Sequence, residues 1–218
     1  MNEWILRSAA ALGLAVAAAG ATHAAQRPET HSEPVSDSRA ERVLHDFAAC
    51  LAASEPRRAR EVLALDYRAS GYAEALTRLV GSNTMCLERG RLTGNGRLFA
   101  GRIAEALLLR SLRGGDLGRR VAFDPARPPL QARDETELMA ICTVRAAPAE
   151  VAALFASRPA SEEENAAVRT LAPRIGGCLA AGTSGRFNRA AIRSMLALAA
   201  WRLSELNSGI RTAAGPAG

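Results

Sequence analysis

Apolar residues recur at helical intervals along the chain. In residues 38–51 one helical face carries Val43, Phe47, Cys50 and Leu51. Ser38 and Glu41 stand at the spacing of a capping box, a pattern that opens many helices. We therefore predict a helix that begins at Ser38.

Three more helices are predicted in the same half of the chain. Pro56, a residue type tolerated in a first helical turn, marks the start of the second. The third carries the apolar positions Tyr72, Leu76, Leu79 and Val80. The fourth, from about Phe99 to Leu112, carries Ile103, Leu107 and Leu112 on its apolar face.

The second half of the chain repeats this order of signals. Its predicted helices open at Asp134 with Glu137, at Pro148, at Ser161 with Glu164, and at about Asn188. Apolar faces are predicted for three of these helices. They are Leu138, Ile141 and Cys142 in the first, Val168, Leu171 and Ile175 in the third, and Ile192, Leu196, Ala199 and Leu203 in the fourth. The last helix is expected to end near Leu206.

The cysteines indicate that the two halves are copies of one unit. An interval of 36 residues separates Cys50 from Cys86, and the same interval separates Cys142 from Cys178. Apolar positions match in order at an offset of 92 residues up to Cys178, and at 89 residues beyond it. We therefore predict an all-α protein made of two tandem, roughly four-helix units.

The units are expected at residues 38–113 and 134–208. Between them, residues 114–133 are rich in Gly, Pro and Arg and are predicted to be a linker, which Val121 and Phe123 would anchor. Residues 25–37 and 209–218 are short and polar or small, so we expect mobile tails there.

Residues 1–24 have the features of a secretory signal peptide. An apolar stretch runs from about Ala9 to Ala19, and Thr22-His23-Ala24 suits a signal peptidase. An uncleaved anchor is the alternative, but the stretch is short and rich in alanine. We expect cleavage near Ala24, no membrane span in the mature chain, and a periplasmic or secreted protein.

Export changes the interpretation of the four cysteines, because an oxidising compartment favours disulfides. Zinc binding is the competitor, but the sequence has no closely spaced cysteine pair, and His45 is the only histidine beyond residue 31. Three pairings are possible, and duplication favours a bridge within each unit. We predict Cys50–Cys86 and Cys142–Cys178, with no metal and no cofactor.

All 28 cationic residues are arginine, and the formal net charge is +6. The excess lies in the first unit, since residues 38–113 hold 13 Arg against 8 acids while residues 134–206 hold 8 of each. A basic chain can bind acidic polymers or nucleic acid, although compositional bias is the simpler explanation. Aromatic residues make up only 4%, which disfavours a nucleic-acid surface of stacked rings.

Candidate catalytic residues are few, and we assign none. A nucleophilic triad needs a histidine base, and His45 is better explained as a solvated helix residue. The acidic run Glu162-Glu163-Glu164 stands at a predicted helix N-terminus, where the helix dipole favours negative charge. Carboxylates in the cleft between the units are the one route left open to hydrolysis.

Asp66, Tyr67 and Arg68 form the most distinctive segment, because the second unit has Arg158-Pro159-Ala160 in the same place. The shared scaffold does not need these three residues, so they are the candidate ligand-binding site. A helix-to-helix turn with a half-buried Tyr67 is the plainer alternative. Arg97 and Arg186 occur in both units and are expected to cap a helix end or pair with an acid.

Several motifs resemble those of a group of uncharacterised exported bacterial proteins with a duplicated four-cysteine helical unit. They are Leu63 to Arg68, Cys86-Leu87, Leu98-Phe99-Ala100-Gly101, and Ala104 to Leu108. The resemblance covers most of residues 40–206. It implies export and duplication, and it carries no activity.

Taken together, these features favour an exported helical binding or interaction protein of the cell envelope, whose partner would be an envelope protein or an acidic polymer. Two alternatives stay open. One is an envelope hydrolase with its carboxylates between the units, and the other is an arginine-mediated binder of acidic polymers.

Overall fold

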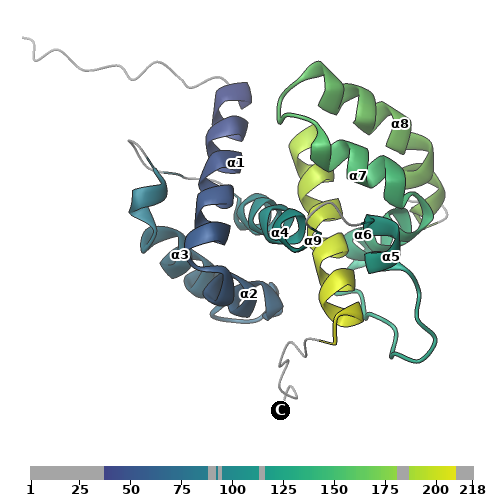
Figure 1. Cartoon of the computed structure of the whole chain (residues 1–218), viewed down its shortest axis with the longest axis horizontal. Coiled ribbons are helices and arrows are strands. Elements are labelled where there is room, and N and C mark those ends of the chain that lie inside the picture. Colours follow the sequence, from purple (N-terminus) through teal and green to yellow (C-terminus); the bar gives the residue numbers. More distant parts are fainter. Residues whose placement is uncertain (1–36, 88–91, 93–94, 113–115, 181–186, 210–218) are drawn as a thin grey trace, which may run out of the picture. The chain divides into compact units, whose positions relative to one another are not determined.

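The computed structural model describes residues 37–209, apart from residues 88–91, 93–94, 113–115 and 181–186. Within these ranges every regular element is a helix (Figure 1). The α-helices are α1 (Asp37–Ser54), α2 (Pro56–Ala64), α3 (Tyr72–Gly81), α4 (Gly96–Leu112), α5 (Leu117–Val121), α6 (Glu135–Ala146), α7 (Pro148–Ala156), α8 (Glu162–Cys178) and α9 (Arg189–Asn207), and η1 (Thr84–Cys86) is a 3-10 turn. The prediction of an all-α fold is confirmed.

The short helices α2 and α7 begin and end in matching ways. Each starts on a proline, and the residues before them, Glu55 and Ala147, share a backbone conformation with φ/ψ of −128°/54° and −141°/54°. The residues that end them, Leu65 and Ser157, are both extended. Both pairs are separated by the offset of 92 residues, so this local geometry is compatible with the predicted duplication.

The two halves also pack their helices in the same order. Contacts join α1 to α4 and α2 to α3 in the first half, and α6 to α9 and α7 to α8 in the second. Figure 1 shows α1–α3 grouped beside α4, and α6–α8 grouped beside α9. The most extensive contact in the fold is between α4 and α9, and the described residues of both halves fall in one compact unit rather than in two separate domains.

A glycine permits the close crossing of α4 and α9. A Cβ atom added to Gly101 would lie 2.3 Å from the Cβ of Ser194 and 2.5 Å from its Cα. Only a residue without a side chain fits here, because the Cβ and the backbone of Ser194 cannot move aside as the end of a flexible side chain can. Around this crossing, fully buried apolar side chains of both helices form the middle of the core, among them Ile103, Leu108, Ala200 and Leu203.

Both predicted disulfides are present. Cys50 on α1 is bonded to Cys86 in η1, with 5.6 Å between their Cα atoms, and Cys142 on α6 is bonded to Cys178 at the end of α8, with 5.7 Å. Each bridge therefore closes one half of the chain, as predicted. Two disulfides indicate an oxidising, extracytoplasmic environment.

The predicted linker contains a short helix, α5, which Asp116 caps through the backbone nitrogen of Gly118. Leu117 and Val121 are buried and anchor it to the core. The prediction was wrong for Phe123, whose side chain is 62% exposed and lies under the guanidinium of Arg145, 5.5 Å from the ring centroid. The predicted signal peptide and nearly all of both predicted tails lie outside the described residues.

No single helix among those described is long and apolar enough to cross a membrane. Taken together, α6 and α7 are long and apolar enough to do so, but the two helices meet at an angle of 100°.

Candidate functional site

An open pocket with a volume of about 610 Å³ lies between the two halves of the chain. Its walls come from the loop after α2, from the segment between α5 and α6, and from the last turns of α9. Its polar lining consists of Asp66, Arg68, Arg127, Gln131, Arg133, Arg202 and Glu205. We call it the arginine pocket, because four arginines face two carboxylates across it.

Tyr67 ties the loop after α2 to the start of α6. Its hydroxyl donates a hydrogen bond of 2.6 Å to Oδ2 of Asp134, and Asp134 in turn caps α6 by accepting from the backbone nitrogen of Glu137. Burial, and then the hydrogen bond to Asp134, raise the pKa of Tyr67 above its usual range. Tyr67 is therefore a structural clamp between the halves.

Asp66 and Arg68 form an ion pair on either side of Tyr67. Their charged groups approach to 2.9 Å, and the backbone nitrogen of Arg68 also donates to Asp66. The hydrogen bond from the Arg68 side chain, followed by that from its backbone, lowers the pKa of Asp66 to about 2. With its side chain 58% exposed, Arg68 stays accessible at the rim of the pocket.

Arg133 stands in the pocket wall, where its guanidinium has no acidic partner among the described residues, although its backbone nitrogen donates to Oε2 of Glu137. Its guanidinium donates to the carbonyl of Ala64, the last residue of α2, and lies over the ring of Tyr67 at 5.2 Å. Burial, and then the positive charge of Arg202, lower the pKa of Arg133. Two arginines thus repel each other here, although Arg202 itself is neutralised by Glu137. An anion beside Arg133 would relieve this repulsion.

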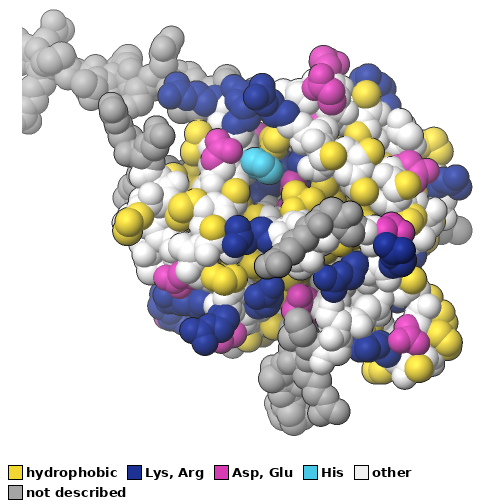
Figure 2. Space-filling view, in the orientation of Figure 1, with side chains coloured by type: hydrophobic (Ala, Val, Ile, Leu, Met, Phe, Trp, Pro, Cys, Tyr) yellow, Lys and Arg dark blue, Asp and Glu magenta, His cyan; other side chains and the backbone are white. Residues whose placement is uncertain are grey.

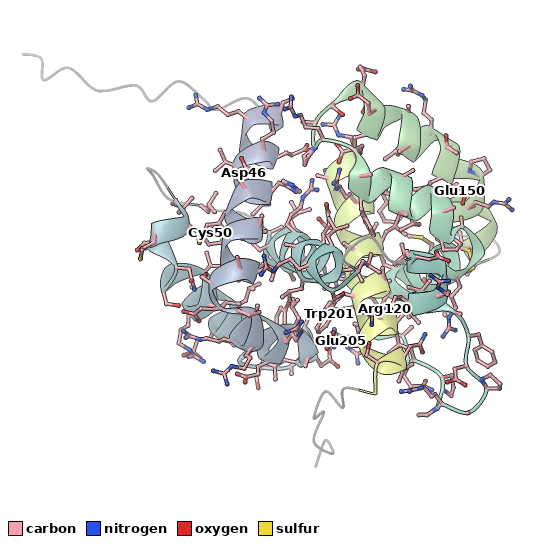
Figure 3. The ribbon with its side chains drawn as sticks, in the orientation of Figure 1. Asp46, Cys50, Arg120, Glu150, Trp201 and Glu205 are labelled. Carbon is pink, nitrogen blue, oxygen red and sulfur yellow. A yellow bond between two sulfur atoms is a disulfide. The ribbon has the colours of Figure 1, made fainter. Side chains whose placement is uncertain are left out.

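Trp201 and Glu205 lie one turn apart near the end of α9 (Figure 3). Both are buried, and the Trp201 indole nitrogen and Oε2 of Glu205 have no hydrogen-bond partner in the described part of the chain. The nearest cation to Glu205 is Arg60 on α2, at 3.8 Å. Burial raises the pKa of Glu205, and the charges of Arg60 and Arg120 oppose that rise.

A second group of charged residues is buried between the halves. Arg193 on α9 donates to both carboxylate oxygens of Glu105 on α4 and to Oε1 of Glu164 on α8. None of the three side chains is more than 1% exposed. Glu164 also accepts a hydrogen bond from the backbone nitrogen of Ala160, so one carboxylate both holds the turn before α8 and binds Arg193. Helix-dipole stabilisation alone, our prediction for the acidic run 162–164, therefore understates the role of Glu164.

Three further residues complete this buried network. Arg189 binds Glu164 and Glu41, and Arg102 lies 3.4 Å from Glu105. The three arginines are thus matched by three glutamates. His45 lies at the edge, 3.8 Å from Glu105, and is half-buried rather than solvated as predicted. The cause is tertiary packing, because α1 turns this face toward α4.

The structure separates the predicted site residues into two roles. Tyr67 is half-buried against the core, as expected if the segment is a helix-to-helix turn. Asp66 and Arg68 line the arginine pocket. The expected pairing of Arg97 with an acid is confirmed, since its Nη2 lies 3.1 Å from Oδ2 of Asp134. Arg186 lies outside the described residues.

Sequence reasoning missed Arg127, Arg133 and Arg202, which supply most of the positive charge of the pocket. Arg127 and Arg133 fall in the predicted linker, and Arg202 falls in the last predicted helix, where no role was predicted for it. The available signal for Arg127 and Arg133 was the density of arginine between residues 119 and 133, which is about twice that of the whole chain.

No group of three His, Cys, Asp or Glu side chains in the described ranges is placed to hold a metal ion. Comparison with protein-family models, with curated proteins and with solved structures finds no match. The resemblance to exported bacterial proteins therefore stays a prediction.

Proposed function

We propose that this chain is an exported binding protein of the cell envelope, and that the arginine pocket takes an anionic group of its ligand. The observation that carries the proposal is the placement of Arg133. Its guanidinium lies beside Arg202, lines the pocket, and has no carboxylate partner within the described residues. A ligand carboxylate or phosphate would supply that partner through paired, charge-assisted hydrogen bonds.

The buried scaffold supports a binding site that is largely formed before the ligand arrives. Tyr67, Asp134 and Arg97 fix one wall, and the hydrogen bonds of Arg202 to Glu137 and to the carbonyl of Gln131 fix another. Side chains held in place lose less conformational entropy on binding, which favours affinity.

Binding is better supported than hydrolysis. Glu105 and Glu164 lie between the halves, but both are fully buried and neutralised by Arg193. Of the two carboxylates in the pocket, Asp66 is paired with Arg68, and Oε2 of Glu205 is buried. Turnover of an envelope polysaccharide by the pure protein would instead establish the hydrolase.

The test uses titration calorimetry of the processed chain with citrate, inorganic phosphate and a uronic-acid oligosaccharide. We expect at least one of these anions to bind at a single site, more weakly as salt is raised. The variant Arg133→Gln should lose that binding at least tenfold. Arg145→Gln is the matched control, because Arg145 also stacks on an aromatic ring but lies outside the pocket. No binding by any of the three anions, or equal loss in both variants, would overturn the proposal.

Export is part of the same proposal. Residues 1–24 have the signal-peptide pattern, and the two disulfides support an oxidising compartment. The intact mass of protein recovered from the periplasm or medium should correspond to a chain that begins near Ala25. Recovery of a membrane-embedded chain that begins at Met1 would contradict export with cleavage.

A further inference from the structure

A second hollow adjoins the arginine pocket and differs from it in character. It is a groove of about 1030 Å³ between α3 and the start of α4. Its apolar lining includes Tyr72, Leu76, Val80, Leu87, Leu92 and Phe99. We call it the apolar groove. Its volume is at the upper end of the range for small-molecule sites, which are mostly apolar with few polar groups.

Arginines stand where the pocket and the groove meet. Arg68 lines both hollows, so this side chain lies at their common boundary. Tyr67 forms the wall between them, with Arg97 of the groove 4.5 Å and Arg133 of the pocket 5.2 Å from its ring centroid. The apolar groove therefore ends near three guanidinium groups, of which those of Arg68 and Arg97 are paired with Asp66 and Asp134.

Figure 2 shows arginine side chains spread over the visible face, interleaved with acids, including groups over the start of α1 and over α2. An apolar groove that ends at arginines, one of them without an acidic partner for its guanidinium among the described residues, fits a molecule with the complementary order, an anionic head followed by an apolar tail.

We propose that the arginine pocket and the apolar groove form one site for a free, single-chain anionic amphiphile, such as a fatty acid or an alkyl phosphate. Its head group binds Arg68 and Arg133, and its alkyl chain lies in the groove against Leu76 and Val80. This inference rests on the proposed function and adds the class of ligand.

The first experiment measures affinity along a ligand series. The processed chain is titrated with acetate, hexanoate, octanoate and decanoate, with decyl phosphate, and with decanol as the uncharged control, all below their micelle concentrations. Each methylene buried in the groove should tighten binding about 4-fold until the groove is filled. Decanol should bind at least tenfold more weakly than decanoate, at a stoichiometry of one for each.

The second experiment separates head from tail by substitution. Arg68→Gln should weaken decanoate binding at least tenfold, while Arg78→Gln should not. Arg78 is the matched control because its side chain is 59% exposed against 58% for Arg68, and each is paired with one acid. Val80→Asp should remove the dependence on chain length and keep the binding of short anions.

Two safeguards accompany the Val80 variant. Val80→Ser is a milder change that should reduce the gain per methylene without loss of fold, as the thermal midpoint checks. Leu138→Asp introduces the same charge at an exposed position outside the groove, and it should leave the dependence of affinity on chain length unchanged.

The outcomes distinguish the two proposals. If no anion of any length binds, the proposed function fails. If short anions bind but chain length has no effect, only the amphiphile site is wrong. Preferential binding to anionic lipid vesicles over the free amphiphile, a groove covered by a second copy in a concentration-dependent dimer, or several decanoates bound per chain would each overturn the amphiphile site.

Discussion

Arg193 on α9 holds Glu105 on α4 through two hydrogen bonds, of 2.9 Å from Nε and 2.6 Å from Nη2, in a place that solvent does not reach. The pair joins the two halves of the chain at their most extensive contact. A charge buried in this way is costly once its partner is removed, because water cannot replace that partner.

Arg193→Met should therefore lower the free energy of unfolding by about 3–5 kcal/mol, since Glu105 and Glu164 both lose their main partner. Chemical denaturation measures the change. The exposed ion pair of Arg78 with Glu74 serves as the control, and Arg78→Met should have almost no effect. Equal effects of the two variants would mean that the buried network does not hold the halves together.

The helices were predictable from sequence, but this network was not. α2 and α3 follow from local signals, namely Pro56 and the apolar spacing from Tyr72 to Leu79. In α4 buried residues extend all around the helix from Phe99 to Glu105, so its charged residues are enclosed along with the apolar ones. A single sequence records that Arg102 and Glu105 are charged, and it does not record that α9 will cover them.

The candidate site was predicted in part for the same reason. Asp66 and Arg68 stood out because the second unit lacks them. Arg133 and Arg202 are separated by most of the second half of the chain, and only the tertiary fold brings them together. Distant charges of like sign carry no local pattern.

The stability of the protein should fall as the pH drops below about 6.5, and His45 should account for part of the loss. Burial lowers the pKa of His45 from its ordinary 6.5, with Glu105 and Asp46 opposing and Arg193 and Arg102 adding to the effect. The unfolded chain therefore takes up the proton first, so protonation favours unfolding. His45→Gln should flatten this part of the curve of unfolding free energy against pH.

Glu205 changes stability in the opposite direction, since its pKa in the folded protein is raised and its protonated form is favoured there. The effect of His45 is therefore read from the difference between the two proteins, in which the contribution of Glu205 cancels. An unchanged pH dependence in His45→Gln would show that this histidine is solvated after all.

Each disulfide should contribute about 4 kcal/mol to stability, because each closes a loop of 36 residues that the unfolded chain would otherwise explore. Replacing Cys50 and Cys86 by serine, or Cys142 and Cys178, should cost similar amounts. Thermal unfolding under non-reducing conditions measures both. Digestion without reduction should release only peptides linked within one half, so a peptide that links the halves would contradict the assignment.

Substitution of Tyr67 should lower the stability of the protein, whereas substitution of Arg68 should weaken its binding of anions. Tyr67→Phe removes the hydrogen bond to Asp134 and should cost about 1 kcal/mol of stability. Arg68→Ala should leave the thermal midpoint nearly unchanged, because the side chain is exposed, and should weaken the binding of anions. A large loss of stability in Arg68→Ala would assign that residue to the scaffold and remove it from the site.

Gly101 and Gly176 should respond in opposite ways to the same substitution. A Cβ on Gly101 meets the Cβ, Cα and carbonyl oxygen of Ser194 at 2.3–2.5 Å, and backbone atoms cannot move aside as the end of a flexible side chain can. Gly101→Ala must therefore push α4 away from α9. Glu105 is one turn further along α4 and Arg193 is next to Ser194, so the same movement strains the buried ion pair. We expect a loss of several kcal/mol, at the upper end for a single substitution.

Gly176 lies in the last turns of α8, and a Cβ there meets nothing within 4 Å. Gly176→Ala should stabilise the protein by about 0.5–1 kcal/mol, because alanine loses less backbone entropy in a helix. Urea denaturation of both variants tests the pair. A tolerated Gly101→Ala would mean that α4 and α9 can separate at their crossing without cost. The buried network would then be held by α1 and α8, whose residues Glu41 and Glu164 also reach it, rather than by the close approach of the two central helices.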